Sequence, residues 1–273
     1  MKQLRAIRIL LATLFLIATT ACLVIGPQIH PMARASATVQ IVLSASAVTI
    51  GVTIVWLVLT FLFGRIYCAS VCPVGVLSDV FLRVRRCVPR LNRPFSYRKR
   101  SVLSVHILWV YILCLLAGVM VVPFLIEPWN IARNMAAAAN ATVVEKTWMT
   151  IGFGAATGVI AGLVSAVLIA GLSLWRGREF CTRYCPVGTA LGIVQEHSLF
   201  HIELDPDRCT SCGLCEDRCR AQCISIADRI VDERRCVRCF DCVADCPEGA
   251  IRYQLNKNMR PASPLMRKNS AKT

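Results

Sequence analysis

Three long stretches of the chain contain no charged residue, and they constrain its fold more than any other feature. They cover residues 35–64, 101–126 and 147–175, and a shorter apolar run covers residues 9–26. A bilayer hydrocarbon core of roughly 30 Å is crossed by about 20 helical residues. The sequence therefore predicts an α-helical polytopic membrane protein with four transmembrane helices, near 8–26, 39–63, 102–126 and 149–175.

The composition agrees with a membrane protein. The chain is 56% hydrophobic and 17% charged, whereas a soluble domain carries about a quarter charged residues. It also has 16 cysteines and a formal net charge of +15. These values exclude a disordered chain, a collagen-like repeat and a small secreted disulfide scaffold.

The first apolar run has two interpretations. Basic residues precede it, and Cys22 lies in a context close to a lipoprotein cleavage site, so the run could be a cleaved signal. The apolar run continues past Cys22 to Ile25, which favours an uncleaved helix.

The distribution of Lys and Arg predicts the orientation. The N-terminus and the segment 65–100 together hold twelve of these residues, while the loops 27–38 and 127–146 hold three. Because short cytoplasmic loops are enriched in Lys and Arg, we expect an inner-membrane protein with both termini in the cytoplasm. The basic charge is then assigned to the membrane surface, and no nucleic-acid partner is expected.

A duplicated motif organises the membrane part, residues 1–198. The segment GRIYCASVCPVG at 64–75 matches GREFCTRYCPVG at 177–188, and each copy directly follows an even-numbered helix. We therefore expect a duplicated two-helix unit with a Cys-x3-Cys-Pro motif at each cytoplasmic end, carried by Cys68 and Cys72 and by Cys181 and Cys185.

Residues four apart share one face of a helical turn, so the two thiols of each pair can contact the same ligand or partner. Three roles stay open for the four thiols. They could bind one additional iron–sulfur cluster, which would be the third. They could act as redox dithiols, with pKa values lowered by Arg65 and Arg178, or as docking features. They could also only pack as small apolar side chains.

A second internal repeat, with a period of 27 residues, carries the clearest cofactor signal. The spacing C-x2-C-x2-C-x3-C occurs twice, and it is the known ligand pattern of two-cluster ferredoxins. In that pattern the fourth cysteine of each run binds the other cluster. The first [4Fe-4S] cluster is assigned to Cys209, Cys212, Cys215 and Cys246, and the second to Cys236, Cys239, Cys242 and Cys219.

Zinc and disulfides are the competing interpretations of these eight cysteines. Structural zinc does not require the third cysteine of each run, and disulfides are rare in a reducing cytoplasm. Cys223 aligns with Ala250 in the repeat and is expected to pack rather than bind iron. Arg220 stands where Pro247 stands in the second copy, and it places a positive charge near the second cluster.

These patterns give three domains. Residues 1–198 form the four-helix membrane domain, and 199–257 form an α+β two-cluster ferredoxin domain with strands at 199–204, 224–232 and 250–255. Residues 258–273 are polar and basic, and they are expected to be a disordered tail.

Up to about residue 257, the chain resembles the NapH/MauN family of membrane-bound ferredoxin-type proteins in its helices, its two Cys-x3-Cys-Pro motifs and its ferredoxin domain. The resemblance implies electron transfer between the quinol pool and a redox partner, and it makes Cys68, Cys72, Cys181 and Cys185 signature cysteines. We expect a quinol dehydrogenase-type subunit that works with other redox proteins, rather than a stand-alone enzyme. A maturation factor that donates electrons during metalloenzyme assembly, or a redox sensor, are the alternatives.

Overall fold

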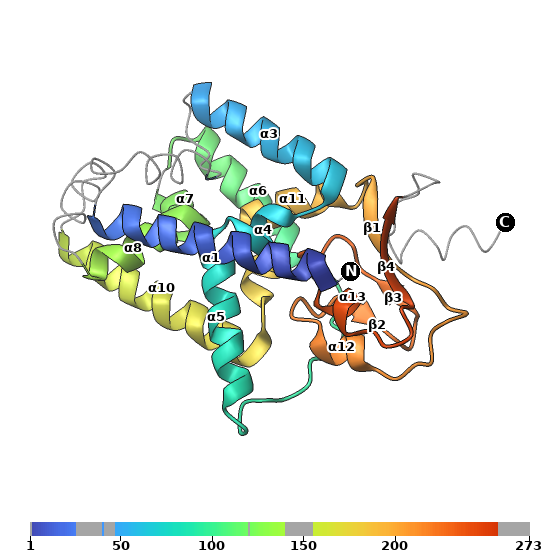
Figure 1. Ribbon diagram of the computed structural model, residues 1–273. Helices are drawn as coiled ribbons and strands as arrows, with labels where there is room; N and C mark the ends of the chain where they lie inside the picture. The colour runs from blue at the N-terminus through green and yellow to red at the C-terminus, as the bar shows by residue number, and fades with distance from the viewer. Residues whose placement is uncertain (1, 26–39, 41–46, 120, 140–154, 256–273) are drawn as a thin grey trace.

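The computed structural model describes residues 2–25, 40, 47–119, 121–139 and 155–255. A helical part packs against a smaller C-terminal region that contains the strands (Figure 1). The predicted tail at 258–273 lies outside the described residues.

Four apolar helices correspond to the four predicted spans. They are α1 (Lys2–Ile25), α3 (Ala47–Phe63), α6 (Leu103–Leu116) and α10 (Ala155–Arg176). In α1 and α10, the segments Gln3–Ala21 and Val159–Arg176 are long and apolar enough to cross a membrane, whereas α3 and α6 are shorter. Large apolar side chains on these helices are exposed, such as Leu10 (69%) and Val167 (71%), as expected where lipid is the neighbour.

The third predicted span is not one continuous helix. After α6 ends at Leu116, Gly118 takes a left-handed conformation with φ of +74°, and α7 (Val121–Ile126) follows. A glycine in this conformation is a common helix stop, because it has no Cβ to clash. The prediction of an uninterrupted helix over 102–126 was therefore wrong.

The next segment, expected to be a loop, contains α8 (Pro128–Ala139), which packs along α10. A Cβ on Gly162 of α10 would lie 2.0 Å from the carbonyl oxygen of Asn134. The glycine thus allows the two helix backbones to approach closely.

The two copies of the duplicated motif fold alike. Helix α3 leads into α4 (Ile66–Ser70) and α5 (Pro73–Cys87), and α10 leads into the π-helical turn η1 (Phe180–Tyr184) and α11 (Pro186–Gln195). In both copies the second cysteine is extended and precedes a proline at the first helical position, where the missing N–H costs nothing. This repetition agrees with a duplicated unit.

The C-terminal region is α+β, as predicted. Strand β1 (Phe200–Leu204) pairs antiparallel with β4 (Ile251–Leu255), and β2 (Ile224–Ser225) pairs with β3 (Ile230–Val231). The predicted strand at 224–232 is therefore a small hairpin. Two short helices, α12 (Leu214–Arg218) and α13 (Asp241–Asp245), each carry the third cysteine of a run.

Helix α1 connects the two parts. It packs against α4, α5, α8 and α13, and its N-terminal end lies beside α13 (Figure 1). Arg5 pairs with Asp245 at 2.7 Å, and Arg8 pairs with Asp79 of α5 at 2.9 Å. These ion pairs hold the N-terminal half of α1 against α13 and α5.

Candidate functional sites

The first four-cysteine set surrounds one pocket. Cys209, Cys212, Cys215 and Cys246 line one small pocket, together with apolar residues such as Ile226. Cys246 is distant in sequence but is held there because β4 brings the end of the second run back to the first. These are the four residues that the sequence placed together.

The second set surrounds a separate pocket. Cys219, Cys236, Cys239 and Cys242 line a small pocket whose remaining walls are apolar. Cys219 therefore lies with the second run, just as Cys246 lies with the first. The structure brings the cysteines together in the crossed arrangement expected of a two-cluster ferredoxin.

The loops around the two pockets repeat an uncommon backbone conformation. Ser211, Gly213 and Gln222 have positive φ angles, and so do the residues 27 positions later, which are Arg238, Phe240 and Gly249. For a residue with a side chain, the left-handed conformation costs roughly 1–2 kcal/mol. Such conformations persist where the surroundings require them, often at binding sites.

The thiols of each pocket line a cavity and do not converge on the position of a single metal ion. In the part of the chain that the structure describes, no three His, Cys, Asp or Glu side chains converge as they would around one metal ion. Burial raises the pKa of Cys215 and of Cys239 to about 12. These groups are neutral thiols in the absence of metal, so binding iron there must release their protons.

Cys223 lies in the wall of the second pocket. Its Sγ is 3.5 Å from the Sγ of Cys219, and its backbone N–H donates to that sulfur at 3.4 Å. The hydrogen bond with the Cys223 side chain lowers the pKa of Cys219 to about 7, although burial opposes this effect. The sequence correctly places Cys223 at a buried position, but it gives no sign of this contact.

The cysteines of the two Cys-x3-Cys-Pro motifs also come together. Cys68, Cys72, Cys181 and Cys185 are all 3–4% exposed, and they belong to one apolar cluster with residues such as Ile169. All four are free thiols. Burial raises the pKa of Cys185 well above its usual value, and the neighbouring thiols of Cys181, Cys72 and Cys68 add to the rise. The four sulfurs are therefore within electrostatic reach of one another.

The arginines of the duplicated motif are buried beside these thiols. Arg178 donates from Nη1 to the carbonyl oxygen of Cys68 at 2.7 Å, and Arg65 donates from Nε to the carbonyl oxygen of Cys236 at 3.2 Å. They are 0% and 1% exposed. The assignment of basic charge to the membrane surface was wrong for these residues, because they fill the seam between the helical part and the C-terminal region.

A buried ionic network centred on Asp79 extends this seam. Its carboxylate pairs with Arg178 at 2.7 Å, with Arg8 at 2.9 Å and with Arg220 at 2.9 Å, and Arg220 continues to Asp241 at 2.7 Å. Burial alone would raise the pKa of Asp79, but the three arginines hold it well below its usual range.

Sequence reasoning missed Asp79. A signal was available, since it is the only acidic residue in the basic segment 65–100.

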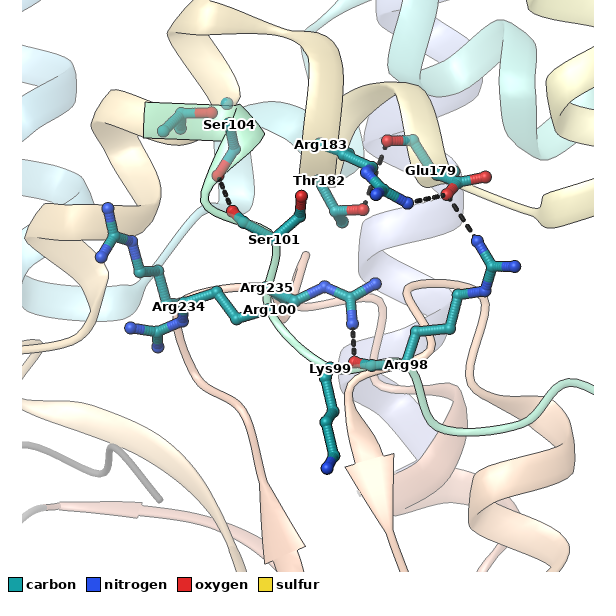
Figure 2. Close-up of a pocket in the computed structure, with 12 residues that line it drawn as sticks. Arg98, Lys99, Arg100, Ser101, Ser104, Glu179, Thr182, Arg183, Arg234 and Arg235 are labelled. Atoms are coloured by element: carbon teal, nitrogen blue, oxygen red, sulfur yellow. Dashed lines mark hydrogen bonds and ion pairs between the residues drawn. The ribbon is translucent and has the colours of Figure 1, made fainter. Parts of the chain in front are cut away.

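A third pocket opens where the segment before α6 meets η1 and the C-terminal region. Six cationic side chains line it, and Figure 2 shows Arg98 and Arg183 both reaching the carboxylate of Glu179, at 2.7 and 3.1 Å. The other four cations are Lys99, Arg100, Arg234 and Arg235. With one carboxylate in its lining, the pocket is positively charged and attracts anionic groups.

Two models of known protein families match parts of this chain. A family model described as a 4Fe-4S binding domain matches residues 46–91 and 159–203, which contain the two Cys-x3-Cys-Pro motifs. A second model of the same description matches residues 202–225, which contain the first cysteine run.

Several curated proteins are similar over most of this chain. YccM of Escherichia coli K12, provisionally named an electron transport protein, is 27% identical over 78% of this chain and 58% of its own length. The ferredoxin-type protein NapH of Haemophilus influenzae is 25% identical over 75% and 67%. The methylamine utilization ferredoxin-type protein MauN of Methylorubrum extorquens is 31% identical over 65% and 56%. No solved structure matches the chain.

Proposed function

Because this chain is a ferredoxin-type 4Fe-4S protein, distantly homologous to NapH and MauN, we propose that it is a membrane-bound carrier. It relays electrons between the quinol pool and a redox partner protein. In this proposal it is a quinol dehydrogenase-type subunit of a larger system.

The observation that carries the proposal is the pair of cysteine pockets in the C-terminal region. Four thiols line the first cavity, and Cys223 and four others line the second, with Cys246 and Cys219 in the crossed arrangement of a two-cluster ferredoxin. The eight cysteines would hold two [4Fe-4S] clusters, each of which takes up and releases one electron. In the second pocket the four ligand cysteines are buried among apolar walls that keep water from their sulfurs, which is one way a protein sets a reduction potential.

Membrane attachment is proposed through four spans with both chain ends in the cytoplasm of the cell. Two helices have the length and composition to cross a membrane, and two shorter apolar helices accompany them. The basic pocket lies next to the start of α6. Basic groups at this level of a membrane protein favour the cytoplasmic side, where anionic lipid is abundant.

A quinol would supply two electrons and two protons, whereas each cluster carries a single electron. The chain would therefore accept the electrons of one quinol in two successive transfers. Its C-terminal region would exchange them with other redox subunits.

The test is the metal content and redox behaviour of the purified full chain. After anaerobic purification we expect at least eight irons and as many sulfides per chain, and reduction of the clusters by quinol in lipid vesicles. Cys219→Ala should lose the second cluster, and Cys114→Ala, at a cysteine outside the three groups, should lose none. Zinc in place of iron would contradict the cluster assignment. Clusters that dithionite reduces but no quinol reduces would contradict the quinol role.

A further inference from the structure

We propose that Cys68, Cys72, Cys181 and Cys185 together bind one further iron–sulfur cluster, with two thiolates from each copy of the duplicated motif. The inference rests on the proposed function, because the additional cluster would be one more electron carrier on the same path. The matched 4Fe-4S family model covers each copy separately; the new element is one site shared by both copies.

The two cysteine pairs are presented by the same backbone geometry. A Cβ on Gly75 would lie 2.3 Å from the carbonyl oxygen of Cys68, and a Cβ on Gly188 would lie 2.2 Å from that of Cys181. In each copy, therefore, only glycine lets the helix start fold back onto the first cysteine. All four sulfurs then reach one buried apolar cluster.

The second cysteine of each pair lies where negative charge is favoured. The backbone N–H of Gly188 donates to the Sγ of Cys185 at 3.3 Å, whereas the Cys72 side chain accepts no such cap bond in the other copy. These sulfurs lie at the first turns of α11 and α5, where the helix dipole favours an anion. Hydrogen bonds to ligand sulfurs are a general feature of iron–sulfur sites.

The buried arginines supply the countercharge. In the part of the chain that the structure describes, Arg65 has no carboxylate within ion-pair distance, and its Nη2 has no hydrogen-bond partner. A buried guanidinium without an anion is costly. Cys68 and Cys181 are the groups whose charge Arg65 and Arg178 both stabilise. A cluster with four thiolate ligands would provide the missing negative charge.

The reactive-dithiol interpretation fits less well. All four thiols are deeply buried, with 3–4% of each residue exposed. Buried thiols of this kind are poor nucleophiles. Packing alone would leave Arg65 without an anion.

The proposed site lies next to the second ferredoxin pocket. The Arg65 side chain donates to the carbonyl oxygen of Cys236, a ligand candidate of that pocket. Gln195 makes a parallel link, since it accepts from the backbone N–H of Arg65 at 2.5 Å and donates to the same carbonyl at 2.9 Å. One electron accepted at the four-thiol site could thus pass directly to the second pocket.

The experiment compares iron and sulfide in the anaerobically purified full chain and its variants. We expect about twelve irons in the wild type, about eight in Cys72→Ala and in Cys185→Ala, and no further loss in the double variant, because both residues serve one cluster. Cys114→Ala is the control and should keep twelve. The electron paramagnetic resonance signals of the two ferredoxin clusters should persist in every variant, which shows that each variant is folded.

Eight irons in the wild type, unchanged in Cys72→Ala, would overturn this inference and leave the proposed function intact. Zinc at the four thiols, or loss of iron in only one of the two single variants, would also overturn it. Fewer than eight irons would count against the proposed function itself. As a second readout, Arg65→Gln should lower the midpoint potential of the additional cluster and Arg65→Lys should retain it. No change in Arg65→Gln would refute the countercharge.

Discussion

Asp79 binds three arginines at once, so its replacement by asparagine tests the buried ionic network. The three closest contacts are 2.7–2.9 Å, and the side chains of Arg8 and Arg178 are 3% and 0% exposed. Removing one partner of a buried ion pair costs about 3–5 kcal/mol, because the remaining charge is left uncompensated. Arg220 keeps Asp241 as a partner, whereas Arg8 and Arg178 lose their only ion-pair partner among the described residues. We therefore expect Asp79→Asn to be destabilised by about 3–5 kcal/mol.

The pH dependence of this difference follows from the pKa of Asp79. The arginines hold this pKa well below its usual range in the folded protein, against the effect of burial. A carboxyl group with a lowered folded pKa contributes its full stability above its unfolded pKa, about 3.9 for aspartate. The gap between wild type and variant should therefore be constant from neutral pH to about pH 4 and should narrow only in stronger acid.

The assay is a thermal melt of the full chain in detergent, followed by tryptophan fluorescence. In proteins of 150–250 residues, 1 kcal/mol shifts the melting temperature by about 2–4 °C, so the variant should melt about 6–20 °C lower. Asp228→Asn is the matched control, because this carboxylate is exposed and, among the described residues, its one side-chain partner is Ser225. A melting temperature of Asp79→Asn equal to that of the wild type would refute the role of the network.

Three further predictions concern single sites and the topology. Cys223→Ala should leave the iron content unchanged but lower the midpoint potential of the second-pocket cluster, since the thiol contact to the Cys219 sulfur is lost; an unchanged potential, measured by redox titration, would contradict this. Gly188→Ala should cost about 1–3 kcal/mol from overpacking against Cys181, whereas Gly171→Ala, in open space, should be neutral or slightly stabilising in the same melt. Reporter fusions should read outside, inside, outside and inside after residues 30, 90, 138 and 200.

The sequence was most informative where local spacing determines the structure. The crossed grouping of Cys219 and Cys246 could be predicted because ligand spacing follows the geometry of the bound cluster. The strands β1 and β4 were also predicted to within a residue of their ends, since alternating apolar residues flank both cysteine runs. A site shared by the two Cys-x3-Cys-Pro motifs was one of three roles left open by their duplication, and the structure places their four cysteines in one buried cluster.

Contacts between distant segments could not be predicted in the same way. A count of Lys and Arg does not distinguish an arginine at the lipid surface from Arg65 or Arg178, which are buried by tertiary packing. The sequence shows Asp79 as a single acidic residue in a basic segment, but only the structure shows which arginines it binds. The break after α6 was missed because residues 101–126 contain no charged residue that would signal a helix end. The helix nevertheless ends there, next to Gly118 in its left-handed conformation.

The attachment of α1 to the C-terminal region has a consequence for biosynthesis. Arg5 and its partner Asp245 are separated by 240 residues, and chains grow at about 5–20 residues per second. For roughly 12–48 s after α1 is made, Arg5 therefore has to wait for the carboxylates of Asp241 and Asp245. Contacts of such long sequence separation form late and slow the completion of a fold. The N-terminal end of α1, which is made first, is thus among the last parts of the helical region to be fixed.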